Sequence, residues 1–207
     1  MLFGQFEVTQ FFANCFVLGC EETREAVIID AGEFSGEVAG FIDDNKLNVK
    51  YIILTHSHID HAGDVGRFKE ETGGEIALHE DEEDMYLNIS AQARMFGFDL
   101  PAPPPAEKLL RHGDELVFGA GHKLGVIHCP GHSPGGISIL SGDRVFVGDT
   151  LFAGSIGRTD LPGGDYRTLI DSIKTRLLPL GDSAEVLPGH GPATSMATER
   201  RYNPFLA

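Results

Sequence analysis

Seven histidine and aspartate side chains in this sequence are of the types that bind metal ions, and their spacing predicts a site for two metals. Four of them fall within residues 56–61, just after the apolar run at residues 51–54. Imidazole nitrogens and carboxylate oxygens suit zinc, iron and manganese. Two such ions about 3.5–4 Å apart can hold a hydroxide and polarise a carbonyl or phosphoryl group. The predicted ligands are His56, His58, Asp60, His61, His132, Asp149 and His190.

The four clustered residues divide between the two ions by their position. In an extended segment the side chains at i and i+2 point to one side, so His56 and His58 can share the first metal. Asp60 and His61 lie beyond the turn and can reach the second. A cluster of this density is not explained by structural roles alone.

Three distant residues complete the two sets. His132 can join the first set and His190 the second, while Asp149 can place one carboxylate oxygen on each ion and so set their separation. A bridging hydroxide would fill the remaining position, since metal binding lowers the pKa of water to about 7. Asp149 and Asp60 are the candidate catalytic residues, and Asp60 is also placed to orient the hydroxide. Each of these three distant residues alone is weak evidence for metal binding. Together with the cluster at 56–61, their order and spacing form one pattern that indicates a metal site.

A few other polar residues could also belong to the metal site. Asp30 follows an apolar run and is either a partner for a ligand imidazole or only a turn residue. Cys129 is an alternative ligand, but His132 already occupies the matching position. The remaining histidines belong to no such pattern, and we assign to surface or strand positions His79, His112, His122 and His128.

The elements that must position these ligands are short strands mixed with helices. Apolar periodicity predicts helices near residues 38–42 and 169–178, and a weaker one at 62–71. Four strands would each deliver a ligand beyond their carboxyl ends, which favours an α/β fold with two sheets face to face and helices outside. The predicted strands are rich in β-branched residues and lie at 15–18, 26–30, 51–54, 76–78, 124–128, 137–140, 145–147 and 185–187.

The composition shifts at about residues 80–105, which predicts a helical insertion within one domain spanning residues 1–207. Met85, Ile89, Ala93 and Phe96 fall on one helical face, and the prolines at 101–105 end any helix. The insertion is either a lid or wall of the pocket, or a hairpin that only covers the core. The acidic run at 80–84 is typical of a solvated helix start.

The charge of the chain limits its partners. Sixteen lysines and arginines stand against 31 aspartates and glutamates, a net charge of −15. This repels nucleic acids and anionic membranes, so we expect a small-molecule substrate and no nucleic-acid or membrane partner. Three cysteines and no signal peptide or transmembrane run favour a cytoplasmic protein. The oligomeric state is left open.

At these residues the chain resembles the metallo-β-lactamase superfamily, whose signature is His-x-His-x-Asp-His followed by distant His, Asp and His. The resemblance spans nearly the whole chain and implies an αββα four-layer sandwich with the dinuclear site at one edge. It implies that the first metal is bound by His56, His58 and His132. It also implies that Asp60, His61 and His190 bind the second metal and that Asp149 bridges the two.

Within the superfamily the chain is similar to the short form of the glyoxalase II-like group, at residues 148–152, 157–164, 188–194 and 203–206. This resemblance implies hydrolysis of a thioester, S-D-lactoylglutathione or a related acyl-thiol, by the bridging hydroxide. The cofactors would be two divalent ions, with zinc preferred and iron or manganese as alternatives. Longer glyoxalase II enzymes add a C-terminal helical domain that contacts glutathione. We expect such contacts to be missing here, because the chain ends soon after His190.

Several alternatives remain within the superfamily. A persulfide dioxygenase with one iron shares the Gly-Arg-Thr-Asp stretch at 157–160 but tends to have Pro-Ala-His-Asp at 188–191. Hydrolysis of another small ester or a lactone is less favoured. β-Lactamases usually lack an equivalent of Asp149, nucleases would carry a basic face, and a flavodiiron reductase would have a glutamate near His58. A binding scaffold without turnover would have lost a ligand, and all seven are present.

Overall fold

The computed structural model describes residues 1–206, and its first sheet follows the order of the chain. β1 to β3 pair antiparallel, whereas β3 to β6 run parallel. β2 and most of β3 and β4 are buried on both faces, which explains their continuous apolar sequences. The strands are β1 (Leu2–Val8), β2 (Ala13–Gly19), β3 (Glu25–Ile29), β4 (Asn48–Ile53), β5 (Glu75–His79) and β6 (Lys108–Leu110).

The second sheet has the order β14-β13-β10-β9-β8-β7. β10 is parallel to β13, and β9 is antiparallel to both β8 and β10. β8, β10 and β13 therefore point the same way. The strands are β7 (Glu115–Phe118), β8 (His122–His128), β9 (Ile137–Ser141), β10 (Arg144–Gly148), β13 (Glu185–Pro188) and β14 (Thr194–Ser195), with a hairpin of β11 (Leu151–Phe152) and β12 (Ser155–Ile156) beside them.

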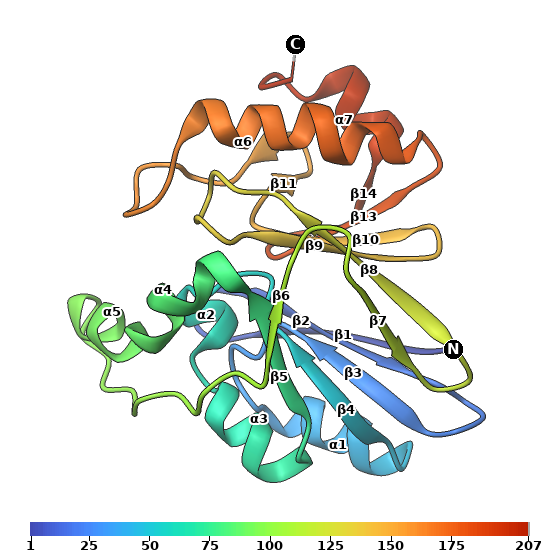
Figure 1. Ribbon diagram of the computed structural model, residues 1–207. Helices are drawn as coiled ribbons and strands as arrows, with labels where there is room; N and C mark the ends of the chain where they lie inside the picture. Colours follow the sequence, from blue (N-terminus) through green and yellow to red (C-terminus); the bar gives the residue numbers. More distant parts are fainter. Residues whose placement is uncertain (207) are drawn as a thin grey trace.

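Helices cover the outer faces of the two sheets, as Figure 1 shows. α1 (Gly36–Asp44) and α3 (Val65–Thr72) lie on the first sheet. α6 (Tyr166–Ser172), its continuation Ile173–Leu177 and α7 (Met196–Tyr202) lie on the second. Between the sheets, Phe16 packs edge-on against Phe146 with ring centroids 5.0 Å apart. The predicted αββα sandwich is confirmed.

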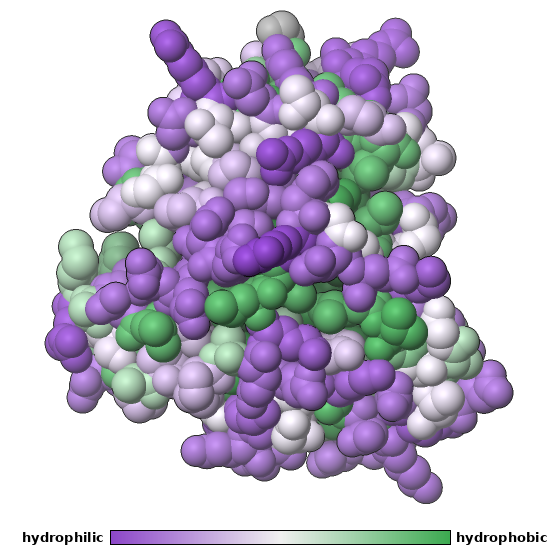
Figure 2. Space-filling model, viewed as in Figure 1, coloured by the Kyte–Doolittle hydropathy of each residue, from purple (hydrophilic) through white to green (hydrophobic). Residues whose placement is uncertain are grey.

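The surface in the same view is mostly hydrophilic, as the net charge leads one to expect (Figure 2). Hydrophobic side chains show along the seam between the two halves, near β6 and β7, and over the helices at the left. Within residues 1–206, no helix is both long and apolar enough to cross a bilayer.

The chain around the histidine cluster differs from the prediction of one helix at 62–71. A short helix, α2 (Ile59–Ala62), begins inside the cluster, and α3 follows it as a separate helix. His58 is the N-cap of α2, with extended backbone at φ −68° and ψ 152°. Asp60 and His61 consequently lie on the first turn of a helix, whereas His56 and His58 lie on the extended segment before it.

The segment at 80–105 folds as two short helices and an irregular return. α4 (Glu83–Leu87) and α5 (Ile89–Met95) meet at Asn88, after a 3₁₀ turn at Glu80–Glu82. Tyr86, Ile89 and Ala93 are buried in the core beneath the first sheet. Tyr86 also donates a hydrogen bond to the Pro104 carbonyl at 2.6 Å, which fixes the proline-rich return against the helices.

Candidate metal centre

The seven predicted ligands converge at one edge of the sandwich. His56, His132, Asp149 and His190 follow β4, β8, β10 and β13, and the carboxyl ends of these strands meet beside α2 (Figure 1). Parallel strands bring their carboxyl ends to the same edge of a sheet, where ligands can converge without long reach. The arrangement expected from the four strand ends is therefore present.

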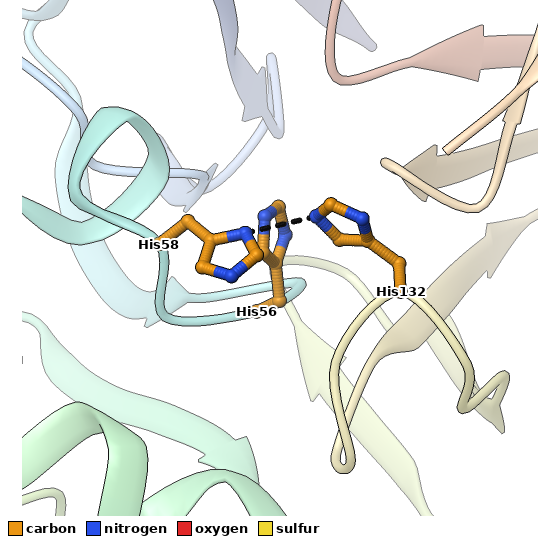
Figure 3. Close-up of side chains that lie close together, drawn as sticks. All are labelled: His56, His58 and His132. Atoms are coloured by element: carbon orange, nitrogen blue, oxygen red, sulfur yellow. Dashed lines mark hydrogen bonds between the residues drawn. The ribbon is translucent and has the colours of Figure 1, made fainter. Parts of the chain in front are cut away.

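The first group of ligands consists of His56, His58 and His132, drawn in Figure 3. One ring nitrogen from each lies within 4.8 Å of the others. His58 Nδ1 is 2.9 Å from His132 Nε2, and all three residues are buried. This is the set predicted for the first metal.

The second group consists of Asp60, His61 and His190. His190 Nε2 lies 3.1 Å from Asp60 Oδ2 and 3.2 Å from His61 Nε2. Glycine at position 189 lets Asp149 and His61 lie against the turn that carries His190. A Cβ there would overlap with Asp149 Oδ1 and lie 2.7 Å from His61 Cε1.

Asp149 lies between the two groups. Its Oδ1 is 3.4 Å from His61 Nε2, and its Oδ2 is 3.6 Å from both His132 Nε2 and His190 Nε2. One carboxylate therefore contacts ligands of both predicted sets, as a bridging residue must.

The chemistry of these residues fits two divalent cations. His56 Nε2 and Asp149 Oδ1 are buried and have no hydrogen-bond partner in the described chain. Leaving such a group unpaired costs about 1–3 kcal/mol, and more if it is charged, so a partner is expected there. Burial, together with the neighbouring imidazole of His132, lowers the pKa of His58 to about 4. At neutral pH the ring is therefore neutral, which is the form that donates a lone pair to a metal.

Hydrogen bonds outside the centre orient the imidazoles. His132 Nδ1 donates to the Arg158 carbonyl at 2.8 Å, and His190 Nδ1 to the Phe12 carbonyl at 3.2 Å. Thr55 Oγ1 donates to Asp30 at 2.8 Å, so in the 3.1 Å contact with His56 Nδ1 the imidazole is the donor. In each ring this leaves the Nε2 lone pair directed into the centre.

Asp30 contacts the imidazole of the predicted ligand His61. This contact is one of the two alternatives predicted for Asp30 from the sequence. Its Oδ2 accepts a hydrogen bond from His61 Nδ1 at 3.0 Å, and its Oδ1 accepts one from the Thr55 backbone at 2.7 Å. Both the ligand helix and the preceding loop therefore depend on this carboxylate.

Replacing Asp30 with alanine is expected to weaken metal binding about 10- to 100-fold, because His61 loses the acceptor that fixes its tautomer and orientation. Competition with a chromophoric chelator would measure this affinity. Asp44→Ala, an exposed aspartate at the end of α1, is the matched control. Equal affinities in the two variants would show that Asp30 is only a turn residue.

Glu82 is a functional residue that the sequence interpretation missed. The acidic run at 80–84 was expected to be solvated, but Glu82 is fully buried. Its Oε1 accepts from the backbone and hydroxyl of Ser57, both at 2.9 Å, and its Oε2 from the Ser133 hydroxyl at 2.9 Å and Gly135 N at 2.7 Å. One carboxylate thus ties the loop of His56 and His58 to the loop of His132.

Asn14 is a second residue that the sequence did not reveal. Its side-chain nitrogen donates to the Pro188 and Gly191 carbonyls at 2.9 and 3.0 Å, and its backbone nitrogen donates to Gly189 at 2.7 Å. These contacts hold both sides of the turn that carries His190. No local sequence signal marks Asn14, since its partners are more than 170 residues away.

His56, His61 and Asp149 also lie close enough to share one ion, whereas a further group of possible ligands, His79, Asp81 and His128, lies outside the centre. The two rings of His79 and His128 are stacked 3.8 Å apart at 15°, so their lone pairs lie in two nearly parallel planes, an arrangement that does not suit a shared ion. His79 Nδ1 accepts from Asp81 N at 3.2 Å, and His128 Nε2 contacts the Pro134 carbonyl at 3.0 Å. Both histidines lie at strand ends, and their rings already have partners. Burial raises the pKa of Cys129 to about 12, which disfavours a thiolate ligand.

The comparisons with known proteins agree with this geometry. The model of the metallo-beta-lactamase superfamily matches residues 8–190. The chain belongs to this superfamily. Hydroxyacylglutathione hydrolase GloC of Haemophilus influenzae is 39% identical over 203 residues, which cover 96% of this chain and 95% of that protein.

Two crystal structures are similar over nearly the full length of both chains. BLEG-1, described as a B3 metallo-beta-lactamase, has a TM-score of 0.91 and 35% identity, with 100% of each chain covered. TTHA1623 in a di-iron-bound form has a TM-score of 0.88 and 36% identity, with 98% of this chain and 100% of that chain covered. The family and the buried His/Asp clusters identify a metallo-hydrolase with residues suited to a dinuclear centre.

Proposed function

We propose that this metallo-hydrolase is a glyoxalase II-like thioesterase, which hydrolyses S-D-lactoylglutathione or a related acyl-thiol. The main observation in support of this proposal is the contact of Asp149 with ligands of both groups, which favours a dinuclear centre. The similarity to hydroxyacylglutathione hydrolase GloC supports a thioester as the substrate. The net charge of −15 supports a small molecule over a nucleic acid or a membrane surface.

Two bound divalent cations supply a hydroxide nucleophile at neutral pH and a Lewis acid for the thioester carbonyl. The chain positions the reactants. Asp60 lines the cavity above the centre with 18% of its side chain exposed, so its carboxylate can accept a hydrogen bond from the hydroxide and orient it. The leaving thiolate has a pKa of about 8.5 and needs little protonation, so the reaction requires no dedicated general acid.

We propose zinc as the native metal, because the donor set consists of imidazoles and carboxylates. Iron is the main alternative, and the di-iron-bound form of TTHA1623 supports it. Manganese also suits these ligands.

Two other activities remain as alternatives. The similarity to BLEG-1 supports hydrolysis of a β-lactam as one alternative, although β-lactamases usually lack an equivalent of Asp149. A persulfide dioxygenase would use one iron on two histidines and one aspartate. The seven histidine and aspartate ligands of the centre together are more than one such iron needs, which favours the hydrolase.

Removing metal is expected to abolish thioester hydrolysis, since no protein side chain replaces the nucleophile. Dialysis against a chelator should lower the rate at least about 100-fold, and added Zn²⁺ should restore it. Metal content and rate would be measured on the same samples, with a mock-dialysed sample as the control. Hydrolysis that persists at negligible metal content would contradict the proposal.

A further inference from the structure

A cavity of about 350 Å³ opens beside the metal centre, between the predicted ligands and the two helices α4 and α5. Its floor includes His58, Asp60, His132 and Asp149. Its opposite wall is largely apolar and includes Met85, Met95, Phe96 and Leu161.

This wall presents apolar side chains to solvent. Met95 is 81% exposed and Phe96 51% exposed. Figure 2 shows hydrophobic surface over these helices, at the left of the view. A hydrophobic patch that borders a polar reactive centre is typical of a surface that binds a ligand.

The two amide side chains of the same wall each use one polar atom in a hydrogen bond within the protein. Gln92 Oε1 accepts from Ile59 N at 3.0 Å, and Asn88 Nδ2 donates to the Asp84 carbonyl at 2.8 Å. Arg158, the one cationic side chain among the residues lining the cavity, donates from Nε and Nη2 to Asp160 at 2.7 and 2.8 Å. The wall therefore offers apolar contact and no unpaired cation.

We propose that this wall binds an aliphatic acyl chain, so that the preferred substrates are thioesters of alkyl carboxylic acids longer than the lactoyl group. The inference rests on the proposed thioesterase function and names its substrate class. The acyl group is assigned to the wall because the thiol of a biological thioester carries polar amides or charges. Such groups would lose hydration against the apolar side chains of this wall. The thiol then faces the open side of the cavity, where Arg158 is 58% exposed.

If an acyl chain binds in this way, kcat/KM rises with the length of that acyl chain. Burying one methylene group is worth about 0.8 kcal/mol, which corresponds to a factor of about four. With partial burial, we expect a two- to fourfold rise in kcat/KM per methylene. Four methylenes, from acetyl to hexanoyl, then give about 15- to 250-fold.

The test uses the metal-loaded enzyme and thioesters of one small neutral thiol, N-acetylcysteamine, with acetyl, butanoyl and hexanoyl groups. A binding readout accompanies the rates: calorimetry with the hydrolysis-inert hexyl and methyl thioethers of the same thiol. The proposal predicts rising kcat/KM and tighter binding of the hexyl compound. Hydrolysis that does not depend on chain length would overturn the acyl-chain proposal and leave the thioesterase function standing. Failure to hydrolyse any thioester would overturn both.

A variant links the effect to the wall. Met85→Gln combined with Met95→Gln keeps the side-chain size but makes the wall polar. It should reduce the hexanoyl-to-acetyl ratio at least about fivefold. Leu87→Gln is the matched control, because Leu87 is 48% exposed on α4 and does not line the cavity. An unchanged ratio in the double variant would contradict the assignment to this wall.

Discussion

Replacing Asp149 with asparagine is expected to lower kcat/KM for thioester hydrolysis by about a thousandfold or more, which corresponds to about 4 kcal/mol of transition-state stabilisation. The carboxylate contacts His61 on one oxygen and His132 and His190 on the other. An amide has nearly the same shape but carries no charge and only one acceptor oxygen, so it offers one metal-binding oxygen where the carboxylate offers two. Fewer than two metals should therefore remain bound.

The rate and the metal content of Asp149→Asn would be compared with those of Asp143→Asn. Asp143 is an exposed aspartate in the turn before β10, remote from the centre. The control is expected to behave as the unaltered protein. If Asp149→Asn retained two metals and a rate within tenfold of normal, the bridging role would be wrong.

Replacing Glu82 with alanine is expected to lower the free energy of unfolding by about 3–5 kcal/mol, as for the loss of a buried charged partner. Four donors from the Ser57 and Ser133–Gly135 loops would lose their acceptor at once. Because these loops carry His56, His58 and His132, metal affinity at the first group should fall too. Urea denaturation and metal titration would measure the two effects.

The matched control for Glu82 comes from the same acidic run. Asp84 is exposed, and Asp84→Ala should change stability by no more than about 0.5 kcal/mol. Glu82→Gln retains one acceptor oxygen and should fall between the two. Equal stability of the Glu82 and Asp84 alanine variants would mean that the hydrogen bonds of Glu82 do not hold the loops.

The central strands could be predicted from the sequence, whereas the half-buried ones could not. β2, β3 and β4 have continuous apolar sequences because both of their faces are covered. β1 alternates and includes Gly4, Gln5 and Glu7, so it shows no apolar run. β7 is a short alternating strand at the edge of its sheet. Pairing with a neighbour, more than local hydrophobicity, determines these strands.

The site was predictable where residue type and order carry the chemistry. His56, His58 and His132 lie together in the structure, and so do Asp60, His61 and His190, while His56 also lies close to His61 and Asp149. Which metal each residue binds stays a prediction. Glu82 was missed because its partners are 25 to 53 residues away and nothing local separates it from a solvated acid. Asn14 was missed for the same reason. Residues that hold ligands in place act through burial and long-range contacts, which only the fold reveals.

The most direct test of the account is to measure the metal content of the purified protein together with its hydrolysis of S-D-lactoylglutathione and the acyl thioester series. The account predicts two divalent metals per chain and thioester turnover that disappears when they are removed. One iron per chain, no thioester hydrolysis, and oxygen consumption with glutathione persulfide would contradict it.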